Sequence, residues 1–187
     1  MRLFVSVQPP AEALAALDAE LGRVRAIAPH GLRWTRPEQW HLTLAFLGEV
    51  ADDTVPALTA ALDAVMSDAP MTLRLAGGGC FGTNVLWVGL AGDVHALRTL
   101  AEAVTAAARG VAVELDDRPY RPHLTLARAG KASADLRHAA GELAQVVGPS
   151  WDVDAVHLMS SRLGQGPGGS AAHVPIATWP RRRRGPA

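Results

Sequence analysis

The chain has 187 residues, of which 49% are apolar and 19% charged; this suits one domain with a sizeable core and excludes a globally disordered protein. Its 18 basic and 18 acidic side chains cancel to a formal net charge of zero, so no overall acidic or basic field selects its partners. The single cysteine, Cys80, excludes an internal disulfide, and no apolar run approaches the roughly 20 residues of a spanning helix, so we expect a soluble, cytoplasmic protein without membrane contacts.

Strand and helix signals alternate along the chain. Short runs rich in β-branched and apolar residues predict strands at 3–7, 40–47, 71–76, 85–90, 111–115, 123–127, 153–160 and 174–178. Apolar residues at helical spacing predict amphipathic helices at 12–25, 55–65, 94–109 and 133–147. The glycine clusters at 77–79 and 164–170 predict turns or loops. Strands mixed with helices, and joined partly by hairpins, favour an α+β fold over a doubly wound parallel sheet.

An internal repeat is the most informative feature of the sequence. Residues 36–48 align without gaps on residues 118–130, so that Arg-Pro-x-x-x-His-Leu-Thr-Leu-Ala-x-x-Gly occurs twice, and a helix signal follows each copy. The repeat predicts a bilobal duplicated unit, with two mainly antiparallel sheets lining a central groove and the helices on the outside. We expect residues 1–180 to form this single domain and residues 181–187 to form a basic, disordered tail.

The repeated motif predicts a polar site. Successive side chains of a strand point to opposite faces, so His41 and Thr43 share one face while the leucines between and after them point to the core; His123 and Thr125 do the same in the second copy. A single histidine in a strand is more often a surface or core residue than a catalytic one. A purely structural repeat, however, needs only the leucines and the turn residues, so a repeated His-x-Thr favours a functional pair.

Two imidazoles without a carboxylate suit acid–base chemistry near neutral pH, with one ring accepting a proton and the other donating one. Threonine hydroxyls can donate hydrogen bonds to oxygens on which negative charge develops. Phosphoryl transfer has these requirements, and a cyclic phosphodiester is a natural substrate because its strained ring supplies a good leaving position. No metal ion or cofactor needs to be invoked.

These motifs resemble those of the 2H phosphoesterase superfamily. The tandem His-Leu-Thr-Leu segments, with Phe-Leu-Gly after the first and an arginine after the second, are most similar to the bacterial and archaeal RNA 2′,3′-cyclic phosphodiesterases, historically called 2′-5′ RNA ligases. The resemblance implies metal-independent opening of a terminal 2′,3′-cyclic phosphate to a 2′-phosphate. The expected partners are RNA ends or small cyclic nucleotides, and we expect a monomer. Two alternatives stay open: a module that binds RNA ends without turnover, and a reversible ligase.

Individual roles follow with less support from the sequence. Thr43, Thr125 and Arg128 are candidates for binding the substrate phosphate, although Arg128 can reach the face of His123 only if the strand ends or bulges near residue 127. A guanidinium beside His123 would keep that ring neutral, which indicates His123 as base and His41 as acid, but the charge of the phosphate opposes this shift. The sequence therefore does not fix the two roles.

Two aromatic residues, Phe46 and Tyr120, could stack on a base or ribose, or could equally pack at the rim or in the core. The remaining histidines have no metal-like spacing and no shared repeat position, so we expect surface or core positions for them. They are His30, His95, His138, His157 and His173.

Overall fold

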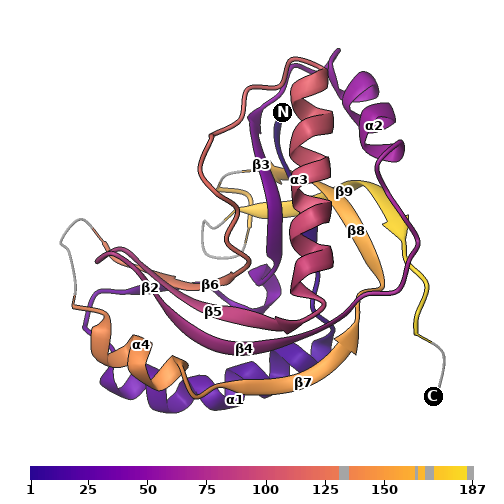
Figure 1. Ribbon diagram of the computed structural model, residues 1–187. Helices are drawn as coiled ribbons and strands as arrows, with labels where there is room; N and C mark the ends of the chain where they lie inside the picture. The colour runs from indigo at the N-terminus through magenta and orange to yellow at the C-terminus, as the bar shows by residue number, and fades with distance from the viewer. Residues whose placement is uncertain (131–134, 163, 167–170, 185–187) are drawn as a thin grey trace.

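The computed structural model describes residues 1–130, 135–162, 164–166 and 171–184, which form two antiparallel sheets with helices on their outer faces (Figure 1). The four-stranded sheet has the order β3 (Leu42–Glu49), β1 (Arg2–Val7), β8 (Ala155–Arg162) and β9 (Ala172–Pro180). The five-stranded sheet has the order β2 (Arg33–Trp34), β6 (Leu124–Arg128), β5 (Val85–Gly92), β4 (Thr72–Phe81) and β7 (Val147–Asp152). The predicted α+β fold with two sheets is confirmed.

Each of the two long helices packs on the sheet that does not contain the strand preceding it. The helices α1 (Ala11–Ile27) and α4 (Arg137–Leu143) pack on the five-stranded sheet, and α3 (Val94–Gly110) packs on β3 beside α2 (Val55–Asp63) (Figure 1). However, α1 follows β1 of the four-stranded sheet, and α3 follows β5 of the five-stranded sheet. Each half of the chain thus has a strand, a 17-residue helix that crosses to the other sheet, and a motif strand, which is β3 or β6.

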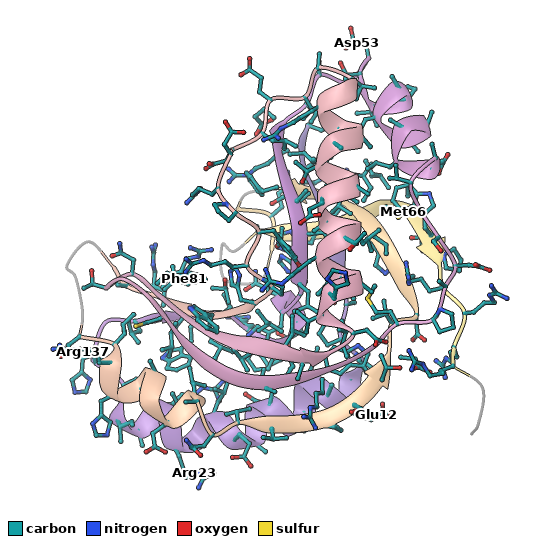
Figure 2. All side chains as sticks on the ribbon, in the orientation of Figure 1. Glu12, Arg23, Asp53, Met66, Phe81 and Arg137 are labelled. Atoms are coloured by element: carbon teal, nitrogen blue, oxygen red, sulfur yellow. The ribbon has the colours of Figure 1, made fainter. Side chains whose placement is uncertain are left out.

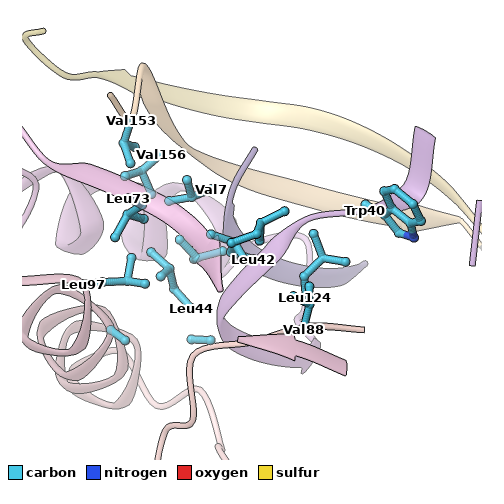
Figure 3. Packing of buried hydrophobic residues seen from close by; sticks show 14 of the residues in the cluster. Val7, Trp40, Leu42, Leu44, Leu73, Val88, Leu97, Leu124, Val153 and Val156 are labelled. Atoms are coloured by element: carbon cyan, nitrogen blue, oxygen red, sulfur yellow. The ribbon is translucent and has the colours of Figure 1, made fainter. Parts of the chain in front are cut away.

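The motif leucines are buried as the alternation predicts. Leu42 and Leu44 in β3, and Leu124 and Leu126 in β6, are at most 3% exposed. Figure 3 shows Leu44 beside Leu97 of α3, and Leu124 close to Val88 of the neighbouring strand β5. The buried residues of both sheets belong to one continuous hydrophobic cluster, so the two lobes share a single core. None of the helices in the described part of the chain is long and apolar enough to cross a bilayer.

Several predicted elements differ from the structure. No strand forms at 111–115, because α3 continues to Gly110 and the chain then folds back, with Val113 N–H bonded to the Ala108 carbonyl. The helix predicted at 133–147 is shorter in the structure, where α4 ends at Leu143. The last residue of the predicted helix, Val147, instead begins β7. This strand lies at the edge of its sheet, where a proline such as Pro149 is tolerated. The start of that predicted helix, residues 133 and 134, lies outside the described residues, as does most of the glycine cluster 164–170.

The glycine run 77–79 is part of β4 and not a turn. Gly77 has a φ of 64° and sits where the register between β4 and β5 shifts, which is a conformation that favours glycine. The strand therefore continues through the run to Phe81, and the hairpin turn to β5 comes after it.

Residues 181–184, the described part of the basic tail, lie beside acidic side chains; the disorder expected for residues 181–187 stays a prediction. Arg182 pairs with Asp68, Arg183 with Asp154 and Arg184 with Asp93. The backbone N–H groups of Arg181, Arg182 and Arg184 also donate to oxygens of Asp154, Asp68 and Asp152, and these bonds hold the chain in place. Residues 185–187 lie outside the described residues.

Candidate active site

A groove of about 150 Å³ where the two sheets meet brings together five of the residues singled out in the sequence: His41, Thr43, His123, Thr125 and Arg128. Thr35, Gln39 and His173 complete its lining. The first copy of the repeat supplies one side of the groove from the four-stranded sheet, and the second copy supplies the other side from the five-stranded sheet.

Both motif strands bulge at the same repeat position, and the bulge brings Arg128 to the groove. In the β5–β6 pairing the partners step from Thr125 to Ala127, so that Leu126 is the extra residue. In the β1–β3 pairing they step from Thr43 to Ala45, so that Leu44 is the extra residue. A bulge reverses the alternation of faces beyond it. Arg128, an odd number of residues from His123, therefore lies on the same face as that histidine.

The two histidines have equivalent hydrogen-bond partners, in each case the backbone carbonyl two residues earlier. His41 Nδ1 lies 2.7 Å from the Gln39 carbonyl oxygen, and His123 Nδ1 lies 2.6 Å from the Arg121 carbonyl oxygen, and Gln39 and Arg121 are equivalent positions of the repeat. A carbonyl oxygen only accepts, so each Nδ1 carries the proton. The Nε2 atom of each neutral ring is consequently the one with a free lone pair, able to accept a proton or, once protonated, to return it.

Burial lowers the pKa of both imidazoles. For His41 burial is the largest cause; although the bond to Gln39 opposes it, the charges of His173 and His123 add to it, and the pKa falls to about 4. Burial is also the largest cause for His123, where the bond to Arg121 raises the pKa and the charge of Arg128 lowers it. The expected influence of Arg128 on His123 is present but secondary. In the free protein both rings are neutral at pH 7, and the ring of His41 stays neutral to a lower pH than that of His123.

Thr35, which the motif analysis did not single out, joins the two copies of the repeat. Its hydroxyl accepts a hydrogen bond from Trp40 Nε1 at 3.0 Å and lies 2.8 Å from the carbonyl oxygens of Thr125 and Leu126. Its backbone N–H donates to the Leu126 carbonyl, also at 2.8 Å. The segment leading to His41 is thereby fixed to the strand that carries Thr125.

His173 is a third groove histidine that sequence reasoning placed on the surface or in the core. Its ring lies 5.3 Å from that of His41 and 5.0 Å from that of Phe4, edge-on to both. The Gln39 side chain donates to the Ala171 carbonyl and so ties the segment before His41 to the start of β9. No local signal in the sequence marks His173, because only the pairing of β8 with β9 brings it to the groove.

Phe46 and Tyr120 are not among the residues that line the groove. Phe46 lies opposite Phe4 in the strand pairing, is 51% exposed and has the Arg2 guanidinium 4.9 Å from its ring centre. Tyr120 packs against the hydrophobic core, and burial raises the pKa of its phenol. Within the described ranges, no group of three or more His, Cys, Asp or Glu side chains could hold a metal ion.

The two-lobed fold and the duplicated His-x-Thr pair agree with the resemblance to the 2H phosphoesterases that the motifs indicated. A model of the 2′-5′ RNA ligase superfamily matches residues 15–165, so the chain belongs to that family, and the resemblance inferred from the motifs is confirmed.

Curated relatives carry the name RNA 2′,3′-cyclic phosphodiesterase. The protein of Thermus thermophilus is 34% identical over 173 residues, which cover 87% of this chain and 83% of the relative. That of Geobacillus stearothermophilus is 34% identical over 139 residues; these are 72% of this chain but only 44% of the relative, so this chain spans less than half of that protein.

Solved structures share the whole architecture. The crystal structure of E. coli LigT in its apo form has a TM-score of 0.75 and is 26% identical, covering 97% of this chain and 98% of LigT. LigT has also been crystallised with 3′-AMP, in a structure that shares the fold at a TM-score of 0.78 and is 23% identical.

Proposed function

We propose that this chain hydrolyses the 2′,3′-cyclic phosphate at the end of an RNA or a nucleotide to a 2′-phosphate, without a metal ion. The observation that carries the proposal is the pair of imidazoles that line one groove, each with its Nδ1 proton bonded to a backbone carbonyl, so that the lone pair is on Nε2. The relatives named RNA 2′,3′-cyclic phosphodiesterase support this choice of substrate. We also propose that the enzyme is a monomer that acts in the cytoplasm.

In the proposed reaction a water oxygen attacks phosphorus in line with the ribose O3′. One imidazole accepts the proton of this water at Nε2, the P–O3′ bond breaks, and the other imidazole, as imidazolium, gives its Nε2 proton to O3′. The products are a 2′-phosphate and a free 3′-hydroxyl. Thr43, Thr125 and the Arg128 guanidinium hold the non-bridging oxygens, on which negative charge increases.

The two rings need different protonation states. Because His41 is the more strongly depressed ring, the free protein does not favour it as the proton donor, contrary to the direction that Arg128 suggested from the sequence. Bound phosphate raises the pKa of both rings, so the order in the complex decides the roles. An ester with a p-nitrophenolate leaving group needs no proton donor; the histidine variant that retains its activity on this ester identifies the donor.

The test is incubation with nucleoside 2′,3′-cyclic phosphates, with and without a chelator, for the wild type and for His41→Ala and His123→Ala. We expect a 2′-phosphate product, no effect of the chelator and loss of at least a hundredfold in either variant. Full activity of either variant, loss with the chelator or a 3′-phosphate product would each refute the proposal. Tight binding of the nucleotide without turnover at any pH would instead identify a binding module.

A further inference from the structure

His173 of β9 lies beside His41 in the groove, although it belongs to neither motif strand. Its ring centre is 5.3 Å from that of His41, and the two rings meet edge to face. Phe4 is 3% exposed and packs against both rings, with its ring centre 4.8 Å from that of His41 and 5.0 Å from that of His173. In the sheet, His173 pairs with Ser161 of β8. Packing and strand register together therefore set the position of the His173 ring.

The two motif histidines have similar aromatic contacts but different polar neighbours. His123 packs against Phe81, whose ring centre is 4.9 Å away and which Figure 2 labels at the end of β4. On this side of the groove the motif strand itself supplies a cation, Arg128. The equivalent position of the first copy is Phe46, which does not line the groove. The polar neighbour of His41 comes instead from β9, and it is a histidine.

The surroundings of His173 determine which of its ring nitrogens carries the proton. Nδ1 is buried and has no hydrogen-bond partner within the described residues. Buried N–H groups are rarely left without an acceptor, whereas unpaired buried acceptors are more common, so the neutral ring carries its proton on Nε2. This tautomer is the opposite of that of His41 and His123, whose protons are on Nδ1. His173 Nε2 is consequently a hydrogen-bond donor, whereas Nε2 of each of the other two rings is an acceptor.

Protonation of His173 does not remove this donor. Burial lowers the pKa of His173, so the ring is neutral at pH 7 in the free protein. The charged and titratable groups that share the groove with it are His41, His123 and Arg128, and Arg162 lies on β8 next to its partner in the sheet. A bound anion raises the pKa of a histidine beside it, and an imidazolium also carries a proton on Nε2. The N–H group at Nε2 is therefore present in both protonation states.

We propose that His173 donates a hydrogen bond from Nε2 to a non-bridging oxygen of the phosphate that lies between His41 and His123. This inference rests on the proposed function. It makes His173 a phosphate-binding residue that neither accepts nor gives up a proton in the reaction. Arg128 approaches the phosphate from the side of His123, and His173 approaches it from the side of His41, so the two groups hold different non-bridging oxygens. Negative charge on these oxygens increases in the transition state, where a donor already in place is most effective.

Two replacements separate the hydrogen bond from the packing of the ring. His173→Phe keeps a ring against Phe4 but has no donor, and we expect it to lower kcat/KM for adenosine 2′,3′-cyclic phosphate by about 10- to 100-fold, as is typical of one hydrogen bond to a charged group. His173→Gln keeps an N–H donor but cannot transfer a proton, and it should retain most of the wild-type activity. His173→Leu, which is smaller and also lacks a donor, should show the same loss as His173→Phe.

His157→Phe is the matched control. His157 lies in β8 of the same sheet, burial lowers its pKa as well, and its Nδ1 is bonded to the Thr178 hydroxyl. It does not line the groove. The replacement should leave kcat/KM unchanged.

Sulfur substitution in the substrate tests the contact with the phosphate itself. Each diastereomer of adenosine 2′,3′-cyclic phosphorothioate has sulfur at one non-bridging position, and sulfur is a weak hydrogen-bond acceptor. In the diastereomer whose sulfur faces His173 the bond is already weakened, so His173→Phe should have little further effect. The same replacement should slow the other diastereomer by about 10- to 100-fold, as it slows the oxygen ester.

Any other pattern overturns the proposal. Equal losses on the oxygen ester and both diastereomers would show that His173 acts through His41 and not on the phosphate. Unchanged kinetics of His173→Phe would show that His173 does not contact the substrate. If His173→Gln were as impaired as His173→Phe, the role of His173 would be proton transfer or ring shape, and a similar loss in His157→Phe would show that the effect is not specific to the groove. A wild type that cleaves none of the three esters would refute the proposed function itself, whereas all the other results require an active wild type.

Discussion

Replacing Thr35 with valine should destabilise the protein by about 2 kcal/mol. Valine keeps the shape of threonine but removes the oxygen that accepts from Trp40 Nε1. Trp40 is 1% exposed, so its N–H would be left without a partner away from water, which costs about 1–3 kcal/mol. The Leu126 carbonyl keeps the bond from the Thr35 backbone N–H, so the loss on the acceptor side is small.

Urea denaturation measures this effect. With a slope of about 2 kcal/mol per M, a loss of about 2 kcal/mol lowers the midpoint by about 1 M. Thr59→Val is the matched control: its hydroxyl donates to a carbonyl of its own helix, so no buried donor is stranded, and we expect a change within about 0.5 kcal/mol.

A double-mutant cycle with Trp40→Phe isolates the pair. Phenylalanine lacks the indole N–H, so this replacement should be less damaging in the Thr35→Val background than in the wild type, by about 1–2 kcal/mol. Additive effects, or an unchanged midpoint for Thr35→Val, would show that the Trp40–Thr35 bond does not join the two copies of the repeat in the way described.

Three further predictions concern charge. Folding lowers the pKa of His41 from 6.5 to about 4, so the unfolded state binds this proton more readily and the free energy of unfolding should decrease as pH falls from 6.5 towards 4. The urea midpoint should therefore fall less over this range in His41→Gln than in the wild type. Equal falls of the midpoint in the two proteins would contradict the lowered pKa. Arg128→Ala should lower kcat/KM for cyclic phosphates by about 10- to 100-fold, whereas Arg118→Ala, outside the groove, should not; equal kinetics of the two variants would exclude a phosphate contact by Arg128. Replacing Arg182, Arg183 and Arg184 with serine should lower the Tm slightly and leave the salt dependence of kcat/KM unchanged, whereas a flatter salt dependence would identify an RNA-binding arm.

The repeat allowed the sequence to predict which residues face the groove from each motif strand. The alternation of strand residues placed His41 with Thr43 and His123 with Thr125, and the odd spacing of Arg128 required a bulge, which the structure has at Leu126. These predictions depend only on neighbours in the chain, for which local geometry suffices.

The rest of the groove depends on pairings between distant segments. His173 reaches it through the β8–β9 register. Phe81 and Trp87, which do not line the groove, pack against His123 because β4, β5 and β6 are adjacent. No short window of sequence contains such information. The same applies to the glycine run at 77–79, whose composition indicated a turn although its small size serves a close approach to an indole ring.

The crossing of α1 and α3 means that neither half of this chain is complete without the other. A polypeptide ending between α2 and β4 would leave β3 without the helix that covers it, and would leave α1 without the sheet on which it packs. Two copies of such a fragment could cover these surfaces by exchanging their helices in a domain-swapped dimer. In the present chain the two halves are covalently joined. The helices therefore stay on the opposite sheets, and both motif histidines remain in one molecule however low the protein concentration is.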